Sequence, residues 1–228
     1  MPRDLAFDVL NATLHSRQPF DDAFDQHPRL RGGRDQLEPR DRGFAFHLVI
    51  TTLRRLGQID DIIDRCLDKK LPPKARFART ILRLGICQLL FLETPPHAAV
   101  STSVDLADRQ KQGPYKKLIN AILRRVGRDS SKLLVGQDTD KLNTPNWLWE
   151  SWLSTYGEET ARKIAAAHLL QPSLDLSFIS DAENWAQKLD AKILPTGGLR
   201  LMSSTSVPEL EGFNEGAWWV QDAAASLP

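Results

Sequence analysis

Apolar positions in this sequence recur mainly every three or four residues, the spacing of one face of an α-helix. Leu5, Val9, Leu10 and Leu14 mark the first such face, between residues 4 and 17. Further helices are predicted over residues 41–56, 59–67, 75–92, 98–109 and 115–127. The segment 75–92 is apolar almost all round, which is typical of a central bundle helix. Because the connections are short and no stretch alternates, the pattern predicts a compact all-α domain over residues 1–130.

The pattern changes after residue 130. Residues 131–143 are polar and predict a linker. Thr144 and Pro145 fit the start of a helix that should end at Tyr156 and Gly157, with a second helix following it. Strands are predicted over residues 174–179, 191–194 and 199–202, and a helix over residues 181–189. We therefore expect a small α/β subdomain over residues 144–206.

Residues 207–228 predict the start of another domain. Residues 217–220 form a short apolar run after Gly216, and small residues follow from Gln221 onward. A strand-to-helix unit of this kind normally begins a larger α/β domain, yet no later strand is present for pairing. Trp218 and Trp219 should point to opposite faces of the strand. We expect the first strand of a truncated Rossmann-type domain.

The charge is distributed unevenly along the chain. Of 228 residues, 26% are charged and 41% hydrophobic, which is typical of a globular protein, and the net charge is +1. Residues 1–140 contain 24 Lys and Arg against 18 Asp and Glu, whereas residues 141–228 contain 6 against 11. This asymmetry predicts that a polyanion would be held mainly by the first part of the chain.

Most kinds of catalytic site find no support in the sequence. Gly32-Gly33 and Gly197-Gly198 are isolated pairs rather than a nucleotide-binding motif, and the five histidines lack metal-ligand spacing. Cys66 and Cys87 lie in apolar helical patterns, which favours buried thiols in a reducing cytoplasm over nucleophiles or a disulfide. No stretch reads as a secretory signal or a membrane span.

Basic side chains around one predicted helix are the best candidates for binding. These side chains form a basic surface, which could be extended by Arg3, the loop Arg29–Arg34 and Arg54-Arg55. Its contacts with a nucleic acid would be with the phosphates. Any one of these residues is more often simply a solvated helix position. The predicted RNA-binding residues are Arg3, Lys116, Lys117, Arg124, Arg125 and Arg128.

Several motifs, in a consistent order, resemble a known family. They are DLAFDVL at 4–10, DRGFA at 41–45, ILRLG at 81–85, QLLFLETPPHAAV at 88–100 and LINAILRR at 118–125. Together they resemble a NusB-type RNA-binding domain at the front of RsmB/Sun-type 16S rRNA (cytosine-C5) methyltransferases. The later GAWWVQDAAAS at 216–226 is similar to the family's lead-in to its catalytic domain.

The resemblance implies a fold and a function. The fold would be mainly α, a NusB-like helical bundle followed by a small α/β subdomain and the first strand of a truncated Rossmann-type methyltransferase domain. The family uses S-adenosylmethionine and two catalytic cysteines, and neither Cys66 nor Cys87 lies in the corresponding motifs. We therefore expect no catalytic, cofactor-binding or metal-binding residue in this chain. It should be the cytoplasmic, monomeric, 16S rRNA-binding portion of such an enzyme, without a membrane partner.

Two alternatives remain open at this stage. The chain could be a standalone NusB-like RNA-binding factor in transcription antitermination, in which case it should have a stable protein partner. It could also be a structural interaction module, which would show no affinity for RNA at low salt.

Overall fold

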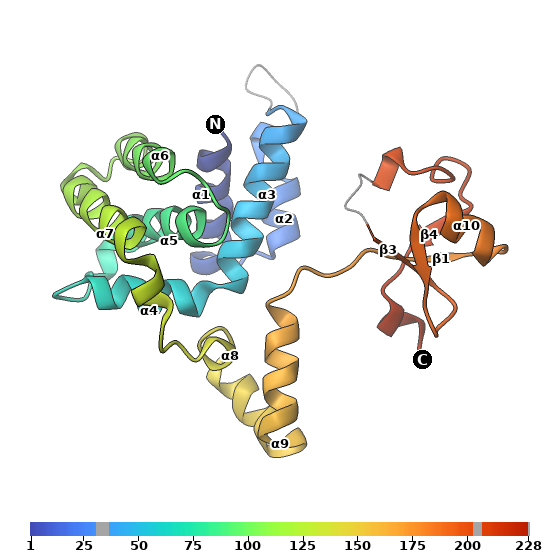
Figure 1. Cartoon of the computed structure of the whole chain (residues 1–228). Coiled ribbons are helices and arrows are strands. Elements are labelled where there is room, and N and C mark those ends of the chain that lie inside the picture. The colour runs from blue at the N-terminus through green and yellow to red at the C-terminus, as the bar shows by residue number, and fades with distance from the viewer. Residues whose placement is uncertain (31–36, 203–206, 228) are drawn as a thin grey trace. The chain divides into compact units, whose positions relative to one another are not determined.

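The computed structural model describes residues 1–30, 37–202 and 207–227, and the chain divides into two units, Met1–Leu169 and Leu170–Pro228 (Figure 1). The first unit is helical and the second contains a small sheet. The helices of the first unit are α1 (Pro2–His15), α2 (Phe20–Asp25), α3 (Pro39–Arg54), α4 (Leu56–Cys66), α5 (Arg76–Leu90), α6 (Pro96–Arg109), α7 (Lys116–Leu134), α8 (Thr139–Leu142) and α9 (Asn146–His168). Short 3-10 turns lie at Pro28–Leu30, Pro73–Ala75 and Gly113–Tyr115.

Helix α5 lies at the centre of the first unit, as its nearly continuous apolar surface predicts. It packs against α1, α3, α4, α6 and α7, which surround it in Figure 1. Ile81, Leu82 and Ile86 of α5 are fully buried. At Gly85 the helices approach so closely that a Cβ atom would lie 2.7 Å from the Leu123 side chain and 2.9 Å from Ser103 Oγ. Gly85 therefore sets how closely α6 and α7 pack against α5.

The stretch predicted as a linker, residues 131–143, is largely helical. Helix α7 continues to Leu134, with one non-helical residue at Asp129, and α8 occupies Thr139–Leu142. The backbone N–H of Gln58 donates to Asn143 Oδ1 at 3.1 Å, and Asn143 Nδ2 donates to Gln58 Oε1 at 2.9 Å. This polar contact with α4 orders the segment without a run of apolar residues. The compact helical unit extends to residue 169.

Helix α9 bends back on itself at Gly157, where the sequence predicts the end of one helix and the start of the next. The backbone of Gly157 has φ 75° and ψ 168°, a conformation that is essentially restricted to glycine. The rings of Trp152 and His168 meet edge to face with centroids 5.2 Å apart. In a straight helix these two residues would be separated by more than four turns. The two arms therefore form an antiparallel hairpin.

The second unit is a four-stranded antiparallel sheet covered by one helix. Its elements are β1 (Asp175–Phe178), α10 (Ala182–Lys188), β2 (Ala191–Ile193), β3 (Leu199–Leu201) and β4 (Trp218–Val220), with the strand order β2-β3-β1-β4. Leu176, Leu199 and Trp218 are buried together, and Trp185 of α10 packs against them. A Cβ atom on Gly212, whose φ is +88°, would meet the rings of Trp185 and Trp218. Only glycine fits there.

Strand β4 completes this sheet. It pairs antiparallel with β1, with Leu176 opposite Val220 and Phe178 opposite Trp218. The sequence led us to expect a strand that opens a further domain, whereas β4 pairs with a strand that precedes it in the chain. Trp218 is buried but Trp219 is 48% exposed, and the residues after Gln221 form a 3-10 turn, Ala223–Ser226, instead of a helix. The fold is mainly helical with a small antiparallel sheet.

Candidate nucleic-acid interface

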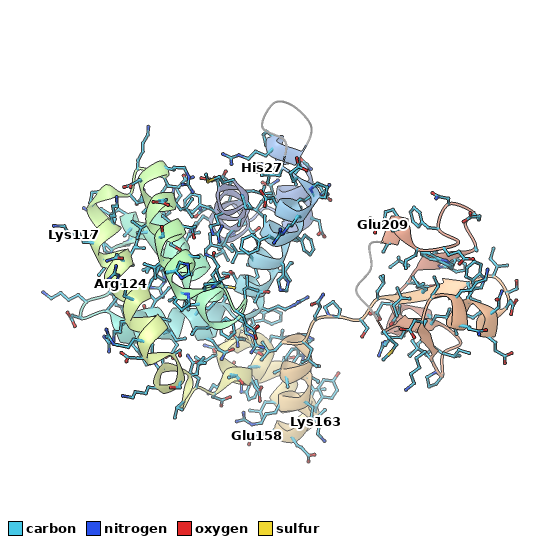
Figure 2. All side chains as sticks on the ribbon, turned by 45° about the horizontal axis from the view of Figure 1, so that its top comes forward. His27, Lys117, Arg124, Glu158, Lys163 and Glu209 are labelled. Carbon is cyan, nitrogen blue, oxygen red and sulfur yellow. The ribbon has the colours of Figure 1, made fainter. Side chains whose placement is uncertain are left out.

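Three basic side chains form a stripe along the outer face of α7. Lys117, Arg124 and Arg128 are exposed, and their spacing of seven and four residues places them on one side of the helix. The opposite side carries Ile119 and Val126, which are fully buried. Figure 2 shows Lys117 and Arg124 on the outside of the helical unit. These three residues are called the basic stripe below.

The other predicted residues of α7 flank this stripe. Lys116 Nζ lies 2.5 Å from Asp108 Oδ2 of α6, so its charge is partly neutralised. Arg125 is exposed on the side of α7 that faces α4, where its charge acts on the Cys66 thiol. The structure thus brings the five predicted residues of α7 together on one helix, with three of them in a single row.

Arg3 lies elsewhere, in the packing between α1, α3 and α5. Its guanidinium carbon is 5.0 Å from the centroid of the Phe44 ring, and its Nε donates to Gln88 Oε1 at 2.7 Å. Burial, and secondarily the nearby Arg109, lowers the pKa of Arg3. The guanidinium is therefore engaged within the bundle and does not lie in the basic stripe.

Two more of the predicted cations, Arg29 and Arg55, contact other side chains, and two lie outside the described residues. Arg29 Nη1 is 3.8 Å from the buried carboxylate of Asp4, which Arg109 Nε also contacts at 2.8 Å. Arg55 packs over the Phe91 ring at 5.2 Å. Residues 31–36, which include Arg31 and Arg34, are outside the described part of the chain.

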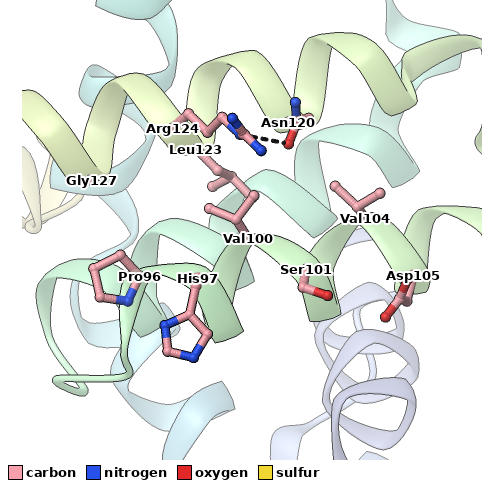
Figure 3. A pocket seen from close by; sticks show the side chains of 10 residues that line it. All are labelled: Pro96, His97, Val100, Ser101, Val104, Asp105, Asn120, Leu123, Arg124 and Gly127. Carbon is pink, nitrogen blue, oxygen red and sulfur yellow. Dashed lines mark hydrogen bonds between the residues drawn. The ribbon is translucent and has the colours of Figure 1, made fainter.

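A groove between α6 and α7 runs beside the basic stripe and was not foreseen from the sequence. Its volume is about 500 Å³. Val100 and Val104 of α6 and Leu123 of α7 point into the space between the helices (Figure 3). The polar residues of its lining are His97, Ser101, Asp105, Asn120 and Arg124. The sequence signal was two rows of polar residues at four-residue spacing, one on each helix.

Arg124 belongs to both the stripe and the groove. Its Nε donates to Asn120 Oδ1 at 3.2 Å, one turn earlier on α7 (Figure 3). This contact holds the guanidinium along the edge of the groove, while its remaining N–H groups stay available to an anion. The groove therefore combines an apolar floor with a cation at its edge.

The cysteines are placed as structural residues. Burial raises the pKa of the Cys87 thiol to about 12, and burial also raises the pKa of Cys66 against the opposing influence of Arg125 and Arg65. A thiol that stays protonated at neutral pH is a poor nucleophile. Across the described ranges, no three His, Cys, Asp or Glu side chains cluster as a metal site would require, and no helix there could cross a membrane.

Comparison with known proteins gives concordant results. The family model described as "NusB family" matches residues 1–128. A probable ribosomal RNA small subunit methyltransferase B of Synechocystis is 32% identical over 98% of this chain and 53% of its own length. Ribosomal RNA small subunit methyltransferase B of Vibrio cholerae is 30% identical over 87% of this chain and 48% of its own length.

The protein of the same name from Pseudomonas putida is also 30% identical, over 85% of this chain and 47% of its own length. This chain therefore spans about half the length of the curated relatives it matches. The crystal structure of PH0851 aligns with 97% of this chain and 53% of its own, with a TM-score of 0.50 and 14% identity. At that identity the likeness concerns the fold alone.

Proposed function

This chain belongs to the NusB family, and from that membership we propose that it binds structured RNA, specifically 16S ribosomal RNA, through the outer face of α7. The observation that carries the proposal is the basic stripe, in which three exposed cations lie in one row above a fully buried apolar face. A row of this kind suits the phosphates of a nucleic-acid backbone. Such contacts position an RNA without reading its sequence.

We further propose that the chain positions RNA for methylation. The relatives named ribosomal RNA small subunit methyltransferase B match it over most of its length, while it spans only about half of theirs. In this proposal the methyl donor is S-adenosylmethionine, the product is a C5-methylated cytosine, and both the donor and the reacting cysteines are held by residues outside this sequence. A Rossmann-type domain would then follow β4 in the cytoplasmic enzyme.

The properties of the two cysteines in this chain support the proposal that the reacting cysteines lie outside this sequence. C5 methylation of cytosine requires a thiolate that attacks the ring. Cys87 has a pKa of about 12 because it is buried, and burial raises the pKa of Cys66 as well. Neither residue is suited to that role.

The proposal is tested by the salt dependence of RNA binding. The full chain is titrated with 16S rRNA helix fragments at several KCl concentrations, and Kd is measured by fluorescence anisotropy. Replacing Lys117, Arg124 and Arg128 by Ala should weaken binding and make the salt slope shallower by about 3, roughly one for each phosphate contact removed.

The matched control removes three exposed cations from other helices. Arg40, Lys141 and Lys163 are exposed on α3, α8 and α9, so their replacement by Ala changes the net charge equally. The control should leave the salt slope unchanged. Equal loss of affinity in both triple variants would contradict a localised interface and indicate binding by net charge alone.

A further inference from the structure

The groove between α6 and α7 has the size and chemistry of a small-molecule site. Its volume of about 500 Å³ is within the range of ligand pockets, which are mostly apolar with a few placed polar groups. Val100 and Val104 supply the apolar floor, and the fully buried Leu123 lies beneath them. This floor belongs to a rigid part of the molecule, because Leu123 is itself packed against Gly85 at the centre of the bundle.

Polar side chains edge the floor on both sides. His97, Ser101 and Asp105 lie on α6, and Asn120 and Arg124 lie on α7. An amide, a hydroxyl, a carboxylate and an imidazole together offer both donors and acceptors. A purely apolar peptide side chain would leave these groups without new partners, whereas the edge of a nucleobase has donors and acceptors of its own.

The neighbouring charge indicates what kind of molecule carries that base. Arg124 lines the groove and also belongs to the basic stripe with Lys117 and Arg128. An RNA whose backbone follows the stripe would pass along the edge of the groove. Proteins commonly recognise RNA through bases that are unpaired and turned out of the helix.

We infer that the α6–α7 groove receives one unpaired base of the bound RNA, with Arg124 contacting an adjacent phosphate. The base lies on Val100 and Val104, above the fully buried Leu123, and its edge faces the polar side chains of the two helices. This inference rests on the proposed RNA-binding function and adds a preference for an RNA with a bulged or looped nucleotide over a continuous duplex.

The test uses two RNA hairpins that differ in one nucleotide. One contains a single bulged 2-aminopurine and the other is fully paired, and both are titrated with the full chain. We expect the bulged hairpin to bind about fivefold more tightly or better, the gain that burial of about 40 Å² of apolar surface gives. The 2-aminopurine emission should change on binding, because the base leaves water for an apolar floor.

Two variants separate the groove from the stripe. Ser101→Trp, at an exposed position of α6, fills the groove and should abolish the preference while leaving the affinity for the paired hairpin unchanged. Lys117→Ala, outside the groove, should weaken the binding of both hairpins by the same factor. Circular dichroism melting checks that both variants are folded.

A second measurement needs no variant. Titration of the wild-type chain with cytidine 5′-monophosphate should shift the NMR methyl signals of Val100 and Val104. The methyl signals of Val135, which is exposed and directly follows α7, should stay in place. Equal affinity for the two hairpins, or a preference that survives Ser101→Trp, would overturn the groove assignment alone. Failure to bind either hairpin at low salt would overturn the proposed function as well.

Discussion

A single carboxylate holds several parts of the second unit together. Asp175 of β1 is 4% exposed and accepts hydrogen bonds from Arg200 Nε at 2.7 Å and Nη2 at 2.8 Å. It also accepts the backbone N–H of Ala223 at 3.2 Å, which fixes the turn after β4. The hydrogen bonds from Arg200 lower the pKa of Asp175, so the ionised form is favoured in the folded state.

This arrangement predicts a pH-dependent loss of stability. Asp175→Asn should destabilise the second unit at pH 7 by about 1.5–3 kcal/mol, the usual contribution of charged hydrogen bonds. Because the folded pKa is depressed, the contribution is complete above the unfolded pKa of about 3.9 and is lost as the pH falls through the folded value. The difference in unfolding free energy between wild type and variant should therefore shrink below about pH 4.

Urea unfolding followed by NMR peak intensities of the second unit measures this difference at pH 7 and pH 3. Asp190→Asn is the control, because Asp190 is exposed and its left-handed backbone, φ 49°, tolerates asparagine. The unfolding free energy of Asp190→Asn should match that of wild type at both pH values. If the difference in unfolding free energy between wild type and Asp175→Asn stays constant with pH, the charge of the carboxylate does not contribute to stability, and the effect comes from the shape of the side chain.

The two thiols should differ in how they react. Cys87 is buried and its pKa is about 12, so at pH 7 roughly one thiol in 10⁵ is ionised. We expect Cys87 to react with Ellman's reagent only as the chain unfolds, whereas the half-buried Cys66 reacts slowly in the folded protein. Rates measured on Cys66→Ser and Cys87→Ser variants identify each site. Fast labelling of Cys87 in native buffer would contradict this assignment.

Among the elements, the contact between α4 and α8 leaves no room for added volume at Gly57. Gly57 lies in the first turn of α4, and a Cβ atom there would overlap the backbone carbonyl of Leu142 in α8. A backbone group cannot turn aside as a side chain can. Gly57→Ala should therefore cost about 1–3 kcal/mol, as overpacking does in other proteins, although alanine favours helices.

The control for Gly57→Ala is the same substitution in an open helix. Gly43 in α3 is exposed and has no heavy atom near the position of a Cβ. Gly43→Ala should stabilise the protein by about 0.5–1 kcal/mol. The melting temperature measured by calorimetry should therefore fall for Gly57→Ala and rise for Gly43→Ala. A gain in stability for Gly57→Ala would exclude the close contact with α8.

Local patterns predict the elements that are long and apolar. The faces of α1, α3, α5, α6 and α7 follow from spacing alone, and the bend of α9 follows from Gly157. Helix α2 was missed because it has only six residues, and its burial depends on Phe20 and Phe24 packing against Phe46 of α3. Helix α8 was missed because amide hydrogen bonds to α4 order it, and these leave no periodic trace in a sequence.

The candidate interface was predictable only in part, for the same reason. A helical wheel places Lys117, Arg124 and Arg128 on one side of α7, so the stripe follows from the sequence. The groove does not, because it exists only when α6 and α7 pack side by side against α5. The position of Arg3 was equally hidden, since its partner Gln88 lies 85 residues further along the chain.

In the whole molecule, the two units are stabilised by different kinds of interaction. The first buries a continuous cluster of mostly aliphatic side chains from seven of its helices, α1 to α7. The second has a much smaller core and adds the Asp175–Arg200 pair, the fitted glycine at Gly212 and the hydrogen bond from Trp218 Nε1 to Glu211 at 2.8 Å. We therefore expect the removal of a polar side chain to lower the unfolding free energy of the second unit more than that of the first.

The contact between Asp4 and Arg109 has a consequence for the time during which the protein is made. The first helix has its ion-pair partner 105 residues later in the chain, so this contact cannot form until α6 has been synthesised. At roughly 5–20 residues per second, that interval lasts roughly 5–20 s. Throughout it, the carboxylate of Asp4, which is buried in the finished fold, lacks the Arg109 guanidinium that pairs with it. The first helix therefore gains its last ion pair only after most of the helical unit has been synthesised.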